Sequence, residues 1–217
     1  MLQAVIFDMD GLLVDTNPVW DAARRWMASE AGKTWGPDDN QAVMGVSTGE
    51  WVDYMTERLD LKLTPSEVED AIVDRMAQTY RERIPWLPGA VEAVELAARE
   101  YRAALASGSP PSLIEAVVAD GAVAGRFEVV VSADEIGAGK PAPDVYLATA
   151  ERLGLEPADC VCLEDSANGI LSGVRAGMKV IAVPDQGFQP PPDVLQRADL
   201  VLGSLEEFTS QRLAALA

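Results

Sequence analysis

Histidine is absent from this 217-residue sequence, and cysteine occurs only at Cys160 and Cys162. The two cysteines lie two positions apart in an apolar run, and no other cysteine or histidine is present to complete a tetrahedral site, so a zinc centre is excluded. Alternation along a strand would turn both side chains toward one face of a sheet, and we expect buried, reduced thiols.

Basic residues are scarce, because 17 Lys and Arg stand against 35 Asp and Glu, which gives a formal net charge of -18. This charge repels nucleic acid and anionic membrane surfaces, so we expect neither as a partner. A small anionic substrate would be repelled as well, and its binding site must therefore hold cations of its own. The charge balance predicts a small-molecule partner and points to a bound metal ion.

Long apolar runs are also missing. The first ten residues, MLQAVIFDMD, have no basic leader and become acidic after a short apolar stretch, which is typical of neither a signal peptide nor a membrane span. Hydrophobic residues still make up 48% of the chain, enough to bury a substantial core. We expect a cytoplasmic protein that is a monomer or a weak homodimer.

Short apolar runs alternate with segments of helical pattern along most of the chain. Such alternation is typical of a parallel sheet with helices on both faces. The sequence therefore predicts an α/β fold with a doubly wound, Rossmann-like parallel sheet. The expected strands are AVIF (4–7), AALA (103–106), VVVS (129–132), CVCL (160–163) and VIAV (180–183).

The stretch between the first two expected strands is far longer than one crossover helix requires. We expect residues 16–88 to form an inserted α-helical cap domain, and residues 1–15 and 89–217 to form the α/β core. Asn17 is expected to cap the first helix of the insert, and the sequence TPSE at 64–67 fits a capping box that opens a long helix.

Polar side chains follow the expected strands at the points where the strands end. In open α/β sheets ligands bind at the carboxyl ends of the strands, so we expect these side chains to cluster. Several carboxylates in one crevice repel one another, and a divalent cation relieves that repulsion. Oxygen ligands without histidine or cysteine favour magnesium, Mg2+. The cluster comprises Asp8 and Asp10 after the first strand, Ser107 after the second, Lys140 in the loop after the third, and Glu164 and Asp165 after the fourth.

The spacing of Asp8 and Asp10 suits a two-step phosphoryl transfer. A chain that bends after Asp8 can aim one carboxylate at phosphorus and the other at the leaving oxygen. Asp8 then attacks to form an aspartyl-phosphate, while Asp10 protonates the leaving alkoxide and later deprotonates water. Ser107 and Lys140 are expected to bind phosphate oxygens.

Four segments of the chain resemble, in order and in spacing, the four motifs of the haloacid-dehalogenase superfamily. They are FDMDG at 7–11, LASGSP around Ser107, GKPAPD around Lys140 and LEDSANG around Glu164 and Asp165. The resemblance spans essentially the whole chain and includes a helical cap between the first two motifs. It points in particular to the group of β-phosphoglucomutase-like and sugar-phosphate phosphatases.

The resemblance implies a magnesium-dependent phosphatase, a phosphoric monoester hydrolase acting on a small phosphorylated metabolite such as a sugar phosphate. It assigns the metal to Asp8, the Asp10 backbone carbonyl and Asp165, with Glu164 as a nearby or outer-sphere ligand. Dehalogenases of the superfamily lack a second acid at the position of Asp10, so its presence favours phosphoryl transfer.

Three residues of the expected cap are candidates for contacting the rest of the substrate. Trp20 comes just past the expected hinge, and Met44 and Thr48 lie in one turn. In the core, Ser109 is expected to cap the helix that begins at Pro110-Pro111.

Two alternatives stay open. β-Phosphoglucomutases have similar motifs, but that family places a histidine near the position of Trp20 and an arginine near that of Thr48, and this chain has no histidine. Receiver domains of response regulators place an acidic pair, a hydroxyl residue and a lysine at the strand ends of a similar sheet. These domains transmit a signal and do not turn over a substrate. The second acid Asp10, the inserted domain and the late pair Glu164-Asp165 favour the phosphatase.

Overall fold

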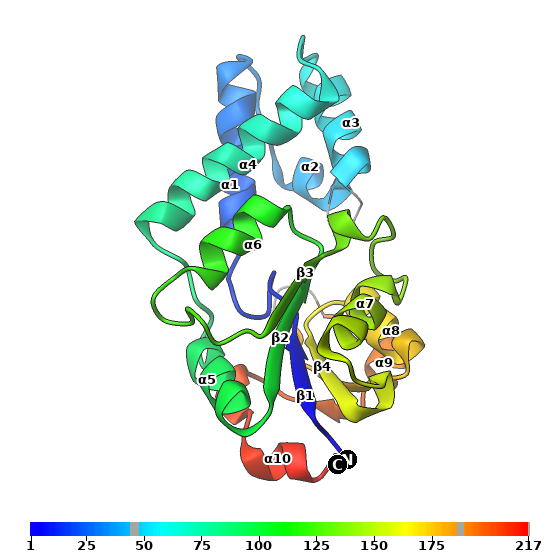
Figure 1. Ribbon diagram of the computed structural model, residues 1–217. Helices are drawn as coiled ribbons and strands as arrows, with labels where there is room; N and C mark the ends of the chain where they lie inside the picture. The colour runs from blue at the N-terminus through cyan, green and yellow to red at the C-terminus, as the bar shows by residue number, and fades with distance from the viewer. Residues whose placement is uncertain (44–47, 186–188, 217) are drawn as a thin grey trace. The chain divides into compact units, whose positions relative to one another are not determined.

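Figure 1 shows the computed structural model, which describes residues 1–43, 48–185 and 189–216. Met44, one of the three candidates for contacting the substrate, lies outside these ranges. Within them, every helix is too short or too polar to cross a membrane.

The larger of two compact units consists of Met1–Asp15 and Ile84–Ala217 and is built on a six-stranded sheet. All neighbouring strands are parallel, in the order β3-β2-β1-β4-β5-β6. The predicted α/β fold with a Rossmann-like parallel sheet is confirmed, and the strand order reverses between β1 and β4. The strands are β1 (Ala4–Phe7), β2 (Arg102–Ser107), β3 (Val129–Ser132), β4 (Cys160–Glu164), β5 (Lys179–Ala182) and β6 (Leu200–Val201).

Helices cover both faces of this sheet. Figure 1 shows α5 (Ala90–Glu100) on one side, and α7 (Asp144–Leu153), α8 (Ala167–Ala176) and α9 (Pro192–Leu195) on the other. Such double cover explains why the strands are continuous apolar runs and do not alternate with polar residues. The unit also contains α6 (Pro111–Val118), α10 (Ser210–Ala214) and the short 3-10 helices η1 (Ala133–Glu135), η2 (Pro157–Asp159) and η3 (Leu205–Glu207).

The two faces of the sheet have different cores. Ile6 packs into the same buried cluster as Cys160 and Cys162, which are free thiols on one face of β4 as predicted. Phe7, the next residue of β1, points the opposite way and makes edge-to-face contacts with Phe127 and Phe208, with ring centroids 6.3 and 6.0 Å apart. Burial of both faces fixes the register of β1 and therefore the position of the residues that follow it.

The smaller unit, Thr16–Arg83, contains helices throughout its described part. The predicted capping box is present, because the Thr64 hydroxyl accepts a hydrogen bond from the Glu67 N–H at 3.3 Å and the Glu67 carboxylate accepts one from the Thr64 N–H at 2.7 Å. The helices are α1 (Asn17–Glu30), α2 (Pro37–Ala42), α3 (Thr48–Leu59) and α4 (Pro65–Glu82).

The expected N-cap at Asn17 is wrong by one residue. Asn17 is already helical, and Thr16 holds the cap position without a side-chain cap hydrogen bond. The Thr16 carbonyl accepts hydrogen bonds from the N–H groups of Val19 and Trp20 at 3.0 and 2.9 Å, so the first turn of α1 closes one residue earlier than the sequence indicated.

Candidate active site

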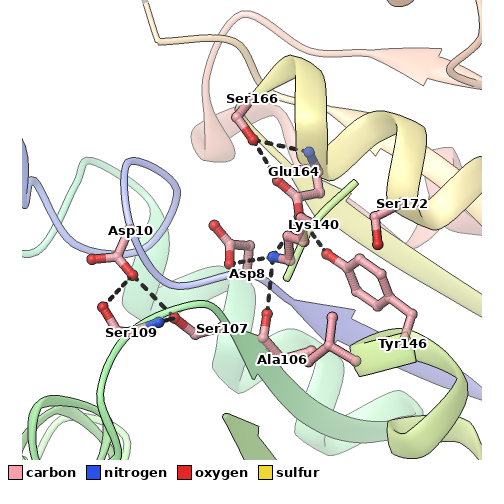
Figure 2. A network of polar contacts seen from close by, with 12 residues as sticks. Asp8, Asp10, Ala106, Ser107, Ser109, Lys140, Tyr146, Glu164, Ser166 and Ser172 are labelled. Carbon is pink, nitrogen blue, oxygen red and sulfur yellow. Dashed lines mark hydrogen bonds and ion pairs between the residues drawn. The ribbon is translucent and has the colours of Figure 1, made fainter. Parts of the chain in front are cut away.

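The predicted polar residues come together at the carboxyl ends of the strands. Figure 2 shows five of them, Asp8, Asp10, Ser107, Lys140 and Glu164. Asp8 follows β1 directly, and its N–H donates to the Leu163 carbonyl of β4 at 3.1 Å, which ties it to the point where the strand order reverses. Ser107 is the last residue of β2 and Glu164 the last residue of β4. Asp8, Ser107 and Glu164 are all buried, so the strand ends hold them in surroundings of low dielectric.

Lys140 links two of these acids. Its ammonium lies 2.6 Å from Asp8 Oδ1 and 2.6 Å from Glu164 Oε1, and it also donates to the Ala106 carbonyl at 3.2 Å (Figure 2). These contacts use all three donors of the ammonium group. The loop that follows η1 thereby places a single cation between two strand ends.

Glu164 is held by a partner that the sequence did not reveal. The Tyr146 hydroxyl, from α7, donates to Glu164 Oε1 at 2.6 Å, and the Lys140 Nζ lies 5.1 Å from the centre of the Tyr146 ring. Gly169, in the first turn of α8, approaches the Glu164 carboxylate so closely that a Cβ there would overlap it. Helices α7 and α8 therefore fix this carboxylate from both sides.

Two serines hold Asp10. Ser107 Oγ donates to Asp10 Oδ2 at 3.0 Å, and Ser109 Oγ donates to the same oxygen at 2.7 Å. The Ser109 N–H donates to Ser107 Oγ at 3.0 Å, which orients the first serine. The expectation that Ser109 caps the next helix is wrong: Pro110 occupies the cap position of α6, and the serine hydroxyl turns to Asp10 instead.

Three carboxylates could share a metal ion. Asp8, Glu164 and Asp165 each offer an oxygen, and these oxygens lie within 4.8 Å of one another. Gly11 has a left-handed backbone with φ 74°, and a Cβ at this position would overlap the Asp165 carboxylate. The loop after β1 thus leaves room for Asp165 beside Asp8.

Burial governs the charge of these groups. It raises the pKa of Asp8 to about 8, with the carboxylates of Glu164 and Asp10 adding to the effect and the Lys140 ammonium opposing it. Burial also raises the pKa of Asp165, and the charges of Asp8 and Glu164 raise it further. The pKa of Lys140, which burial alone would lower, is raised by the two acids it contacts. Ionising all of these acids would therefore leave more negative charge than one lysine offsets.

The candidates for contacting the rest of the substrate belong to the smaller unit. Trp20 is half-buried on α1 and packs edge-to-face on Trp51 of α3, with ring centroids 5.7 Å apart. Thr48 is the first residue of α3 and is partly exposed.

Comparison with known proteins identifies relatives of this chain. A sequence profile of haloacid dehalogenase-like hydrolases matches residues 2–177. The chain is 35% identical to hexitol phosphatase B of Escherichia coli, over 97% of this chain and 96% of that protein, and 32% identical to a phosphorylated carbohydrates phosphatase of Thermotoga maritima, over 83% and 84%.

Among solved structures, β-phosphoglucomutase from Clostridium difficile superimposes with a TM-score of 0.81 at 22% identity, over 100% of this chain and 97% of that one. At this identity the likeness shows the fold alone. The resemblance drawn from the four sequence motifs is confirmed by the profile match and by the two relatives. The chain belongs to the haloacid dehalogenase-like hydrolase family.

Proposed function

We propose that this protein is a magnesium-dependent phosphatase that removes phosphate from a small phosphorylated metabolite, a sugar or sugar-alcohol phosphate, through an aspartyl-phosphate on Asp8. The observation that carries the proposal is the buried Asp8 carboxylate, which lies beside the Lys140 ammonium and close to two further acids at the reversal of strand order. The names of the relatives, a hexitol phosphatase and a phosphorylated carbohydrates phosphatase, support this substrate class.

The acidic residues at these strand ends fit a magnesium ion. Asp8, Glu164 and Asp165 offer oxygen donors only, the type of ligand that this hard cation prefers. Burial and mutual repulsion raise the pKa values of Asp8 and Asp165, and a divalent cation would relieve both effects. Held by these acids, the ion would supply the positive charge that lets a phosphate bind among acidic side chains.

Asp8 is the proposed nucleophile. Its carboxylate attacks phosphorus in line with the leaving oxygen, so the bond from Asp8 to phosphorus forms as the ester bond breaks. Burial acts against the ionised form of Asp8, and the Lys140 ammonium 2.6 Å away favours it. The same ammonium would donate to a transferring phosphate oxygen in place of one of its three present acceptors.

Asp10 is the proposed acid and base. It gives its proton to the leaving alkoxide, then accepts a proton from the water whose oxygen attacks phosphorus, and this second step releases inorganic phosphate and restores Asp8. Ser107 and Ser109 both donate to Asp10 Oδ2 and hold that carboxylate in one orientation. The smaller unit would act as a mobile cap that admits the substrate and excludes bulk water.

The alternatives are less well supported. A mutase cycle of the β-phosphoglucomutase type lacks the cap histidine expected near Trp20, since the chain has no histidine. A receiver-like phosphoacceptor would not need the second acid Asp10 beside its serines, nor the pair Glu164-Asp165 close to Asp8.

The test is phosphate release from a panel of sugar, sugar-alcohol and glycolate phosphates, with and without magnesium, together with an assay for glucose 6-phosphate formed from β-glucose 1-phosphate. We expect metal-dependent release without isomer formation. Isomer without release would establish the mutase, and a long-lived phosphoprotein without turnover would establish the receiver.

Asp8→Asn should abolish release while the circular dichroism spectrum stays unchanged. Asp193→Asn, at an exposed aspartate of α9, serves as the matched control and should keep full activity. If Asp8→Asn retains more than a few per cent of wild-type activity, the assignment of the nucleophile is wrong.

A further inference from the structure

Helix α8 begins directly after the acidic pair that ends β4, and its first turn is fitted to one of these acids. Ser166, the N-cap, accepts a hydrogen bond from the Gly169 N–H at 3.1 Å and donates one to Glu164 Oε2 at 3.4 Å (Figure 2). Gly169 lies against the Glu164 carboxylate, where a Cβ would overlap it. The start of α8 therefore fixes the position of this carboxylate.

The second half of the same helix holds the turn that carries Lys140. Ser172 Oγ donates to the Ala142 carbonyl at 2.6 Å, and the Arg175 guanidinium donates to the Pro141 carbonyl at 2.7 Å. The two carbonyls that follow Lys140 are thus both bound by side chains of α8. A helix that begins at the acids of β4 ends in contact with the lysine turn.

These contacts matter because the turn lies outside the sheet, in the loop between η1 and α7. The Ala142 N–H closes it by donating to the Gly139 carbonyl at 3.0 Å. Ser172 is fully buried, so loss of its hydroxyl would leave the Ala142 carbonyl without this donor, away from water. The place of the Lys140 ammonium among the acids therefore depends on α8.

The residues of α8 that make these contacts are spaced by three along the chain. Residues with this spacing form one ridge on the surface of an α-helix. The ridge runs from the acid at the end of β4 to the turn that carries the lysine, so one rigid element sets the distance between them. Its members are Ser166, Gly169, Ser172 and Arg175.

We propose that Ser172 and Arg175 are positioning residues for phosphoryl transfer, which hold the Lys140 turn at a fixed distance from Glu164 and Asp165. This inference rests on the proposed phosphatase function, in which the Lys140 ammonium acts on the transferring phosphate. A displacement of about 1 Å in such a group costs about a hundredfold in rate, so small shifts of the turn reduce turnover.

The test measures kcat on the substrate that the panel identifies, with the full-length protein and saturating magnesium. Ser172→Ala should lower kcat by about tenfold, because the Ala142 carbonyl loses a buried donor. Arg175→Ala should lower it by about threefold, since water reaches this exposed contact. The double variant should lose more than the product of about thirtyfold, because either contact alone still restrains the turn. Arg175→Lys keeps a donor and should restore most of the loss.

The magnesium concentration that gives half-maximal rate separates positioning from a general loosening of α8. In both variants this concentration should stay the same or fall, because Glu164 and Asp165 remain in place and a displaced Lys140 ammonium competes less with the cation. A disturbed helix would loosen the acids too and would raise the magnesium requirement.

Two control variants match these changes elsewhere in the larger unit. Thr149→Val removes a buried hydroxyl that donates to the Val145 carbonyl at 2.7 Å within α7. Arg152→Ala removes an exposed arginine that donates to the Val130 carbonyl at 3.5 Å. Both should keep the wild-type kcat, and thermal melts followed by circular dichroism report on folding.

Hydrogen exchange followed by mass spectrometry tests the inference without turnover. Exchange in residues 139–142 should be faster in Ser172→Ala and in Arg175→Ala than in wild type, while exchange in β4 stays unchanged. The inference is overturned if the turn exchanges as in wild type, if kcat falls no further than in the controls, or if the magnesium requirement rises with the loss of kcat. If wild type releases phosphate from no member of the panel, the proposed function fails, and exchange alone decides: an increase confined to the turn supports the inference, and one that spreads to β4 contradicts it.

Discussion

At the scale of single residues, the candidate active site depends on two shared oxygen atoms. Glu164 Oε1 receives both the Lys140 ammonium and the Tyr146 hydroxyl, each at 2.6 Å. Asp10 Oδ2 receives the hydroxyls of Ser107 and Ser109. Shared acceptors couple the positions of their donors, so a change at Tyr146 should be transmitted through Glu164 to the lysine beside Asp8.

Tyr146→Phe tests this coupling. The variant keeps the ring beside Lys140 but loses the hydroxyl that donates to Glu164. We expect kcat to fall by about tenfold, or about 1.4 kcal/mol, near the lower end for a hydrogen bond to a charged group, while KM changes little. Steady-state kinetics on the substrate that the panel identifies measures both constants.

Tyr54→Phe is the matched control, because Tyr54 also donates to a carboxylate, that of Asp39 at 3.0 Å, in the smaller unit. This control should lower thermal stability and leave kcat intact. Equal effects of both variants on kcat, or a change confined to the melting temperature in Tyr146→Phe, would make Tyr146 a structural residue only.

The sequence located the polar residues of this cluster but not their partners. Asp8 and Glu164 could be found because each comes at the end of an apolar run that had to be a buried strand. Lys140 could be found because it lies in a loop between two such runs. Tyr146 could not be found in this way, since a tyrosine on an amphipathic helix has the same pattern whether it packs in the core or donates to a buried acid. Ser109 was assigned to a helix cap because local spacing carries no information about Asp10, 99 residues away.

At the scale of elements, prediction succeeded where burial covered both faces of a strand. The five expected strands are present with ends shifted by at most one residue. The strand β6, Leu200–Val201, was missed because two residues at the edge of a sheet form no apolar run. The start of α1 was misplaced because Thr16 and Asn17 are both good capping residues, and only the backbone hydrogen bonds distinguish them.

The helices of the smaller unit are linked by an acid that sets their pH response. Asp39 of α2 accepts hydrogen bonds from the Gly36 N–H at 2.9 Å, from Tyr54 at 3.0 Å and from Arg58 at 2.8 Å. Burial acts to raise the pKa of Asp39, but these donors together hold it below its ordinary value. A lowered pKa contributes stability above the pKa of the unfolded chain, and this contribution is lost as the pH falls through the folded-state value.

Asp39→Asn should therefore lower the melting temperature at pH 7, and its difference from wild type should shrink as the pH falls below about 4. Tryptophan fluorescence melts between pH 3 and pH 7 measure this difference. Asp53→Asn, at an exposed aspartate of α3, is the control and should show no such trend. A difference that stays constant across the range would show that the carboxylate charge of Asp39 does not contribute.

At the scale of the whole molecule, a formal charge of -18 opposes folding and opposes the binding of anions. The repulsion between negative charges matters most among the buried acids of the larger unit. There, burial and neighbouring carboxylates raise the pKa values of Asp8 and Asp165. Added salt screens the surface charges but reaches the buried ones only weakly. An experiment should therefore be able to separate stabilisation by a cation bound at a specific site from stabilisation by general charge screening.

Magnesium should stabilise the folded protein through the cluster of Asp8, Glu164 and Asp165. An ion that binds only the folded state at a hundredfold excess over its dissociation constant adds about 2.7 kcal/mol, or about 5 to 10 °C in melting temperature for a chain of this size. The melts are followed by circular dichroism at constant ionic strength, so that screening of the net charge is the same in every sample.

Asp165→Asn removes one of the three acids and the repulsion it adds, so it should melt at or above the wild-type temperature without magnesium yet lose most of the shift with it. Asp193→Asn, exposed on α9, should keep the full shift. Four of the five tryptophans belong to the smaller unit, so fluorescence melts report mainly on that unit. A shift seen by circular dichroism and reduced in fluorescence would place the ion in the larger unit, whereas an equal shift in Asp165→Asn would mean that magnesium acts only by screening.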